Sequence, residues 1–389
     1  MSLPCDAVDV ETVQATVAAL VPTLAAAAED ADTNRCLTPL AAKALREAGA
    51  HRLLQPAAFG GAETSVAEHV RVAAKAAEGC VAAGWCVGLW SVHNWMLAQF
   101  SASTQAAVWA DPGSLISGSI VPRALMTDDG PDHVLVEGRF GFASGSDHAD
   151  WLLIGGRVSR GGPPEPAMGV VPRTSVVIDE DSWDVGGLRG SGSRDLVIEK
   201  PLRIERGRLF FTEDSARRTA PGQTVNTASL FHAPFHTIGI LALAPPAVGG
   251  ARAALARFID RMDAHLMVLR RVQQRDDHAA RMRVTKAAAA IDSAERTMLA
   301  AAELCDAAGR ASERDRLAEA TIARDSAFAV RQCARAVDLL YEAAGGSALD
   351  RREPLQRIWR DVHAVRAHAV LTWDAAAANY ADALLGPVS

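Results

Sequence analysis

The N-terminal third of the chain carries apolar side chains at the three- and four-residue spacing of amphipathic helices. The first such run is Val13, Val17, Leu20, Val21 and Leu24, and Pro22 within it marks a kink or boundary. Thr38 followed by Pro39 predicts a second helix start, and Ser65 with Glu68 forms the capping-box pattern of a third. A mostly helical N-terminal region is expected.

The pattern changes after the turn sequence Asp111-Pro112-Gly113. Short runs rich in β-branched and aromatic residues then alternate with turn residues, a pattern typical of strands. The expected strands are residues 134–140, 151–154, 176–178, 195–199 and 209–211. Together they predict a small antiparallel β domain.

Helical periodicity returns for the remainder of the chain. Four segments are expected, at roughly 235–270, 276–309, 312–344 and 354–384, with Ser312 capping the third and Gly345-Gly346 ending it. Helices of about 30 residues are each about 45 Å long, which suits an up-down bundle. The expected division is residues 1–112 for an N-terminal helical domain, 113–229 for a central β domain and 230–389 for a C-terminal four-helix bundle.

The composition argues against several classes of function. The formal net charge of −6 is spread without blocks of one sign, so neither nucleic acid nor an anionic membrane is an expected partner. The six cysteines lack a CxxC pair, which favours reduced thiols in the cytoplasm. No signal peptide is indicated, and no uninterrupted apolar span approaches the length of about 18 residues expected of a membrane helix. No metal site is expected, because the sequence has no HExxH and its histidine pairs diverge.

A stripe of aromatic and histidine side chains is the first candidate for chemistry. Trp85, Leu89 and His93 are spaced i, i+4, i+8 and therefore share one helical face. The indole could pack against a planar cofactor while the imidazole reaches a substrate beside it. An ordinary aromatic core helix would show the same spacing.

Three Ser/Gly-rich turns are the second candidate. The first is residues 115–122, which contain Ser119 in a strand that turns at Pro122. The others are residues 142–151, which contain Ser144, and residues 187–194, which contain Ser193. Such turns can bring N–H groups and hydroxyls close to a bound ring or phosphate. They lack the GxGxxG order of a dinucleotide fold, and each of them alone could be only a turn.

The last expected helix carries a third candidate. Asp361 and His368 are seven residues apart, which places them on nearly the same helical face, with Arg360 beside them. His368 could be a catalytic acid or base, or it could be a buried core histidine.

Taken in order, these segments resemble the acyl-CoA dehydrogenase superfamily and, more narrowly, the group D two-component flavin-dependent monooxygenases. The resemblance covers roughly residues 10–385. It rests on residues 54–61, Gly84-Trp85, His93, residues 142–151, residues 187–193 and residues 354–368. It implies a mostly α fold with a central β domain, flavin at the junction of the domains, and a homotetramer.

The resemblance also implies roles for individual residues. The implied catalytic residues are His93, Ser144 and His368. The implied cofactor-binding residues are Trp85, Ser119, Ser144, Ser193, Arg271 and Ser347. His93 would accept a phenol proton, Ser144 would hydrogen-bond near flavin N5 and the C4a-hydroperoxide, and His368 would position substrate or stabilise the peroxide. Ser119 would also face the substrate, and Arg270 or Arg271 would reach the flavin phosphate of a neighbouring subunit.

One position separates oxygenase from dehydrogenase. Many acyl-CoA dehydrogenases have a catalytic glutamate eight residues after the Arg-Asp pair, where this chain has Ala369. The expected function is therefore the oxygenase component of a two-component monooxygenase. It would use O2 and reduced FMN or FAD from a separate NAD(P)H:flavin reductase to hydroxylate a small phenolic or electron-rich aromatic substrate. N-hydroxylation of an amine, acyl-CoA dehydrogenation and a non-catalytic flavin-fold protein are the alternatives.

Overall fold

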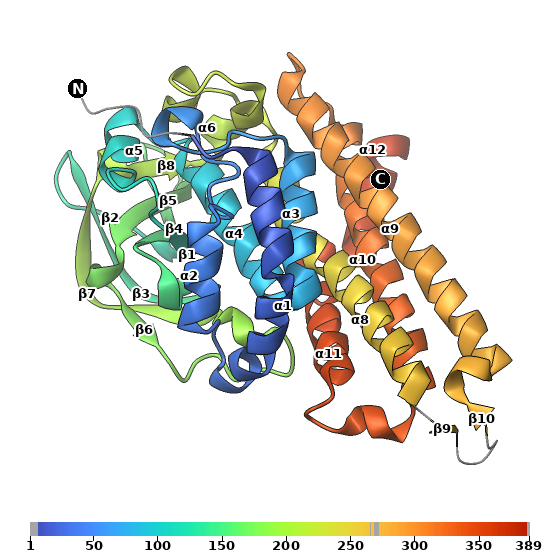
Figure 1. Cartoon of the computed structure of the whole chain (residues 1–389). Helices are drawn as coiled ribbons and strands as arrows, with labels where there is room; N and C mark the ends of the chain where they lie inside the picture. Colours follow the sequence, from blue (N-terminus) through green and yellow to red (C-terminus); the bar gives the residue numbers. More distant parts are fainter. Residues whose placement is uncertain (1–6, 265, 268–271, 387–389) are drawn as a thin grey trace.

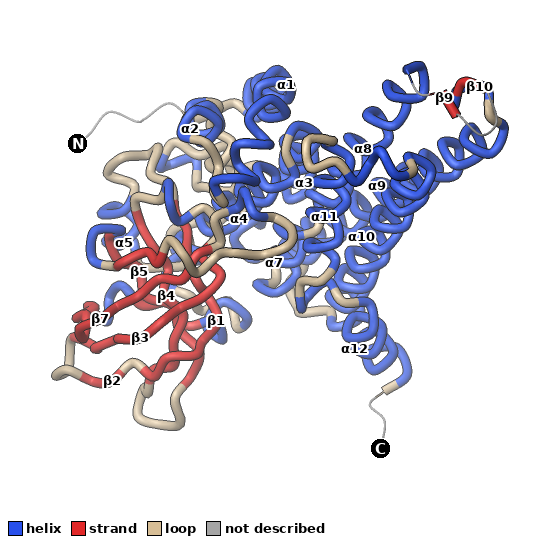
Figure 2. Tube along the Cα trace, turned by 90° about the horizontal axis from the view of Figure 1, so that it is seen from below, coloured by secondary structure: helices blue, strands red, loops and turns tan. Residues whose placement is uncertain are grey.

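The computed structural model describes residues 7–264, 266–267 and 272–386. The N-terminal helices lie between a β domain on one side and long C-terminal helices on the other (Figure 1). Seen from below, the strands of the β domain gather at one end of the molecule and the long C-terminal helices lie at the other (Figure 2). This arrangement confirms the predicted fold class.

From residue 7 onward, the N-terminal region contains five α-helices. They are α1 (Val10–Asn34), α2 (Pro39–Glu47), α3 (Val66–Gly79), α4 (Val81–Leu97) and α5 (Ala102–Val108). Thr38 and Ser65 cap α2 and α3 as predicted, and α1 continues through Pro22 without a break. Every residue of α4 except Leu89 is buried. This apolar character on all sides is expected of a helix at the centre of a fold.

Two four-stranded sheets form the β domain. The strands are β1 (Ile116–Leu125), β2 (Thr127–Asp128), β3 (His133–Ala143), β4 (Trp151–Val158), β5 (Glu165–Pro172), β6 (Val177–Asp179), β7 (Arg194–Glu205) and β8 (Leu209–Phe211). The orders are β1-β4-β5-β8 and β2-β3-β7-β6, and β1 with β4 is the parallel pair. In β4, Leu152 and Ile154 pack in the β core whereas Leu153 joins the helical core. This alternation follows from the two-residue period of a strand.

Two features of the β domain differ from the prediction. The sequence pattern identified neither β2 nor β5. In addition, β1 continues through Pro122 instead of turning there. The pairing of β1 with β4 shifts register between Ser119 and Ala124, and an edge strand with such an irregularity tolerates a proline.

The C-terminal region contains α6 (Thr212–Ala216), α7 (Phe235–Leu243), α8 (Pro245–Ala264), α9 (His278–Arg310), α10 (Arg316–Ala344), α11 (Pro354–Arg366) and α12 (Trp373–Leu385). Strands β9 (Leu266–Met267) and β10 (Val272–Gln273) form a small antiparallel pair between α8 and α9.

Three details of the predicted bundle were wrong. The first expected helix divides into α7 and α8 at Pro245. The cap of α10 is Asp315, whose carboxylate accepts the Leu317 and Ala318 N–H groups, and not Ser312. The fourth expected helix ends at Arg366, so His368 lies in the connection to α12 and does not share a helical face with Asp361.

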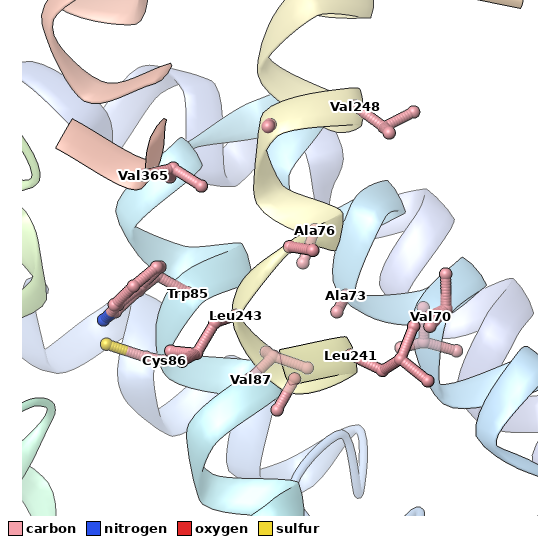
Figure 3. Packing of buried hydrophobic residues seen from close by; sticks show 14 of the residues in the cluster. Val70, Ala73, Ala76, Trp85, Cys86, Val87, Leu241, Leu243, Val248 and Val365 are labelled. Atoms are coloured by element: carbon pink, nitrogen blue, oxygen red, sulfur yellow. The ribbon is translucent and has the colours of Figure 1, made fainter. Parts of the chain in front are cut away.

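One continuous apolar core joins the N- and C-terminal helices. Figure 3 shows its centre, where α3, α4 and the α7–α8 pair meet. The labelled side chains there include Val70, Ala73, Trp85, Val87, Leu241 and Val248. The expected domain boundaries near residues 112 and 229 remain a prediction. The apolar core contains residues of both helical regions and so does not divide the chain at these positions.

Two helical stretches are long and apolar enough to cross a membrane by length and composition, namely Val10–Asn34 and Phe235–Asp263. The most apolar window of the second is 78% buried inside the protein. That of the first is 17% buried, and this helix lies near the N-terminus. Buried core helices and N-terminal signal sequences meet the same criteria, so length and composition are weak indications here.

Candidate active site

A cavity of about 540 Å³ opens where α4, β1, β3, α7 and the segment after α11 meet. Its walls are mainly apolar. The polar side chains among its lining residues are His93, Ser119, Ser144, Trp85, Trp183, Ser193, His236 and His368. An apolar cavity with a few convergent polar groups is the usual form of a small-molecule site.

Helix α4 presents Trp85, Leu89 and His93 to this cavity, as their spacing predicted. Nδ1 of His93 lies 3.1 Å from the carbonyl oxygen of Ile116, which can only accept a hydrogen bond. That nitrogen therefore carries the proton in the neutral ring, and Nε2 is left as an acceptor. Burial lowers the pKa of His93 to about 4, so the imidazole is neutral near pH 7 and does not titrate near its ordinary value.

Ser144 is the centre of a hydroxyl cluster. Its Oγ accepts a hydrogen bond from Nε1 of Trp85 at 3.0 Å and lies 2.6 Å from Oγ of Ser193. Oγ of Ser193 lies in turn 2.7 Å from Oγ of Ser191. Strand pairing brings these turns together, because Ala143 at the end of β3 is paired with Arg194 at the start of β7.

Gly145 allows the two turns to meet. Its φ of +69° lies in the left-handed region, and an added Cβ would lie 2.5 Å from Nε1 of Trp90. Its N–H donates to the carbonyl oxygen of Ser191 at 2.7 Å. A glycine is thus required beside Ser144 both for conformation and for space.

His368 reaches the cavity from the connection after α11. Its ring centroid is 5.7 Å from that of Trp85. Its Nδ1 is buried without a hydrogen-bond partner among the described residues, and burial lowers the pKa of the ring. A buried unpaired nitrogen is costly unless something pairs with it. Together with the Ser144 hydroxyl and the Trp85 face, it fits a planar heteroaromatic group such as a flavin ring.

Ser119 faces the same cavity from β1. Its Oγ donates to the carbonyl oxygen of Gly141 at 2.7 Å, and the side chain is buried. The hydroxyl can still accept a hydrogen bond from a bound molecule. Trp85, His93, Ser119, Ser144, Ser193 and His368 are therefore all lining residues of one cavity.

Comparison with known proteins identifies the family. A model described as the acyl-CoA dehydrogenase C-terminal domain matches residues 241–373. The flavin-dependent monooxygenase oxygenase subunit HsaA of Mycobacterium tuberculosis (strain CDC 1551 / Oshkosh) is 33% identical over 325 residues, which cover 81% of this chain and 80% of that protein. The chain belongs to the flavin-dependent monooxygenase oxygenase components.

Two further relatives agree with this assignment. The oxygenase component of the FADH(2)-dependent resorcinol hydroxylase of Rhizobium sp. (strain MTP-10005) is 33% identical over 347 residues, covering 85% of this chain and 84% of its own. The crystal structure of 3-HSA hydroxylase from Rhodococcus sp. RHA1 has a TM-score of 0.90 at 32% identity, covering 97% of this chain and 98% of that one.

Ser347, an expected flavin contact of this oxygenase component, lies away from the cavity. Ser347 lies between α10 and α11, where its Oγ accepts a hydrogen bond from Nη2 of Arg261 at 2.7 Å. It is not among the residues that line the cavity. Arg271 and its alternative Arg270 lie outside the described residues. Their roles toward a neighbouring subunit's flavin remain predictions.

Sequence reasoning missed several lining residues of the oxygenase component. Phe142 and Trp183 meet edge to face with centroids 6.1 Å apart, and α7 contributes His236 and Gly239. Phe142 has a φ of +67° and is 64% exposed, both unusual for phenylalanine. The Ser/Gly turn that begins at Phe142 was the only sequence signal near any of these residues.

Asp361 is buried behind the cavity wall, and its ionisation predicts how stability depends on pH. Burial raises its pKa to about 7, against the opposing hydrogen bond from the Leu188 N–H; the neighbouring Asp32 adds a smaller raising effect, and Arg360 and Arg357 oppose it more weakly still. Because the pKa in the folded state lies above the ordinary 3.8, this contribution to stability is present below pH about 4 and is lost as pH rises through about 7.

Asp361→Asn has no carboxyl group to titrate at this position. The stability of this variant should therefore depend less on pH than that of the unaltered protein. We expect the melting temperature of Asp361→Asn to rise relative to that of the unaltered protein between about pH 5 and pH 8. Calorimetry of both proteins across this range measures the difference. A constant difference across the range would contradict the assignment.

Proposed function

We propose that the cavity binds reduced FMN or FAD together with a phenolic substrate, and that the phenol hydroxyl donates its hydrogen bond to Nε2 of His93. The observation that carries this proposal is the 3.1 Å contact of His93 Nδ1 with the Ile116 carbonyl oxygen, which makes Nε2 the acceptor of a side chain that lines the cavity. Ser144 and His368 lie on the same cavity and would hold the flavin ring beside Trp85.

The flavin supplies the electrons and the activation of O2 when it is bound. The reaction puts one oxygen atom of O2 into the aromatic ring in place of hydrogen, while the other leaves as water. The protein's own residues orient the ring, exclude water and hold protons. The apolar walls formed by Leu89, Val92, Ile240 and Leu243 favour the exclusion of water.

His93 supports the reaction as an acceptor more than as a strong base. A phenol has a pKa of about 10, whereas burial lowers the pKa of His93 to about 4. Complete proton transfer from the phenol to His93 is therefore unfavourable. A hydrogen bond to Nε2 still increases electron density on the phenol oxygen and fixes the ring, and both effects favour attack on the ring carbons.

The residues that line the cavity also argue against acyl-CoA dehydrogenation, and the names of the relatives against N-hydroxylation of an amine. No aspartate or glutamate is among the described residues that line the cavity. A dehydrogenase needs a base that removes an α-proton from a thioester, and Ala369 occupies the position at which many relatives carry it. The curated relatives are named as hydroxylases and monooxygenases, which does not favour the amine N-hydroxylase.

The designation of the relatives as oxygenase subunits or components implies that a separate reductase supplies the reduced flavin. The function is tested by adding reduced FMN or FAD, O2 and a panel of monohydric and dihydric phenols to the purified protein. A hydroxylated product that depends on all three additions supports the proposal. Release of hydrogen peroxide alone with every phenol contradicts it.

We also propose a homotetramer that works in the cytoplasm. Exposed apolar side chains of the C-terminal helical region support association between copies, among them Leu349 at 71% and Leu385 at 81% exposure.

The free cysteines Cys36, Cys80, Cys86, Cys305 and Cys333 suit a reducing compartment. Sedimentation equilibrium would test the first proposal, and cell fractionation the second.

Gly239 offers a test of where the substrate lies. It lines the cavity from α7, and a Cβ added there would meet nothing within 4 Å. Gly239→Ala should raise the free energy of unfolding by about 0.5–1 kcal/mol, because alanine is the better helix former. The longer side chain of Gly239→Leu should raise KM for bulky phenols more than for small ones. Equal KM changes across a size series would place the substrate elsewhere.

A further inference from the structure

One stretch of the cavity wall, Gly186–Leu188, is held from behind by two adjacent residues of α11. Oδ1 of Asp361 accepts a hydrogen bond from the Leu188 N–H at 2.7 Å. Nη1 of Arg360 donates to the Gly186 carbonyl oxygen at 2.7 Å. All three residues of the stretch line the cavity. A single helix turn therefore holds both ends of this wall segment.

The backbone of the stretch lies against the helix in a conformation that needs support. Leu188 has a φ of +54°, in the region that L-residues with side chains seldom adopt. A Cβ added to Gly187 would lie 2.3 Å from the carbonyl oxygen of Arg360. Strained backbone of this kind persists when surrounding contacts over-determine it, and Asp361 and Arg360 supply such contacts.

The two side chains are themselves fixed. Asp361 is 4% exposed. Arg360 forms a fork to the carboxylate of Asp32 on α1, with nitrogen–oxygen distances of 3.2 and 2.9 Å. Beyond this pair, the chain continues to Ala364, Ala367 and His368, which line another part of the cavity. The segment that carries His368 therefore begins with the helix that holds the wall stretch.

We propose that Arg360 and Asp361 are positioning residues that fix the Gly186–Leu188 wall relative to His368 and so determine how completely the cavity excludes water. This inference rests on the proposed function only where turnover is measured. A displaced wall admits water, and water diverts oxygen activation toward free hydrogen peroxide. The expected signature is loss of coupling between O2 consumption and hydroxylation.

The placement itself can be tested without flavin. In Asp361→Ala, the Leu188 N–H loses its acceptor, so its protection from hydrogen exchange should be lost. Asp361→Asn keeps a side-chain oxygen that can accept this hydrogen bond and should restore most of the protection. Unchanged exchange at the Leu188 amide in Asp361→Ala would overturn the proposed role.

Turnover supplies the second test. We expect Asp361→Ala to lower the hydroxylation rate by about tenfold or more and to release most of the consumed O2 as hydrogen peroxide, since small misplacements in an active site have effects of this size. Asp361→Asn should recover coupling. Native coupling in Asp361→Ala would overturn the proposal. If the unaltered protein forms no hydroxylated product, the proposed function fails, while the exchange experiment still tests the placement.

A matched control separates positioning from stability. Asp306 on α9 also accepts backbone hydrogen bonds, from the N–H groups of Val66 and Ala67, but it does not line the cavity. Asp306→Ala should lower the melting temperature and leave coupling intact. If both variants lose coupling in proportion to stability, the role of Asp361 is only structural. Should Asp361→Ala not fold, Arg360→Met removes the donor to the Gly186 carbonyl oxygen and must show the same loss of coupling.

Discussion

Replacing His93 with leucine is expected to slow hydroxylation by about a hundredfold or more, in the range found when a positioned acid or base is removed. Leucine retains the apolar volume but leaves the phenol hydroxyl without an acceptor in a dry cavity. Binding of the reduced flavin should change little, because Nε2 of His93 is assigned to the substrate. Single-turnover kinetics with pre-bound flavin measure the two effects separately.

His69 provides the control for this variant. It is fully buried on α3, burial lowers its pKa to about 4 as for His93, and it does not line the cavity. His69→Leu should therefore leave the hydroxylation rate unchanged. If the rate of His93→Leu equals that of the unaltered protein, His93 has no role as acceptor.

The acid limb of the rate gives a second check on His93. Its pKa is lowered from 6.5 to about 4, so its contribution to stability is present above the ordinary value and is lost as pH falls through about 4. The same shift keeps Nε2 unprotonated at pH 6. The hydroxylation rate should therefore not fall as the pH is lowered through 6.5. A fall there that is present in the unaltered protein and absent in His93→Gln would contradict the lowered pKa.

Replacing Ser144 with alanine should affect both stability and coupling. The Trp85 N–H would lose its acceptor, and a buried unpaired donor costs about 1–3 kcal/mol. The Ser193 hydroxyl would lose a partner at 2.6 Å. We expect a lower melting temperature and a several-fold greater share of O2 released as hydrogen peroxide. Oxygen consumption and product formation, measured together, report this share.

Two comparisons make the Ser144 result decisive. Ser326 on α10 is fully buried, and its Oγ has no partner among the described residues. Ser326→Ala should therefore change neither the melting temperature nor the share of O2 released as hydrogen peroxide appreciably. Ser144→Thr keeps the hydroxyl and should retain more coupling than Ser144→Ala. Equal coupling in Ser326→Ala, Ser144→Thr and Ser144→Ala would show that Ser144 has no role in the reaction.

The sequence predicted the parts of the site that depend on local geometry. Trp85 and His93 are eight residues apart on one buried helix, and helical spacing alone places both on the same face. Ser144 and Ser193 lie in turns that looked unremarkable separately. Their 2.6 Å contact depends on the pairing of β3 with β7, which is a long-range property. Only the resemblance to a family indicated that they belong together.

The segment after α11 shows why other details could not be predicted. Helical periodicity continues beyond Arg366, and no glycine or proline occurs between residues 366 and 372. The helix nevertheless ends there, and His368 enters the cavity from a connection. Tertiary packing overrides local propensity at this point. The Asp361–Leu188 contact, between residues 173 positions apart, was equally inaccessible to reasoning from local pattern.

The most direct test of the account is the source of the oxygen atom in the product. The purified protein would be given reduced FMN or FAD and a phenol that it converts, under ¹⁸O2 in ordinary water, and the product would be analysed by mass spectrometry. The account predicts one ¹⁸O atom in each newly hydroxylated ring. A product oxygen derived from water, or oxidation of an acyl-CoA with no hydroxylation of any phenol, would contradict it.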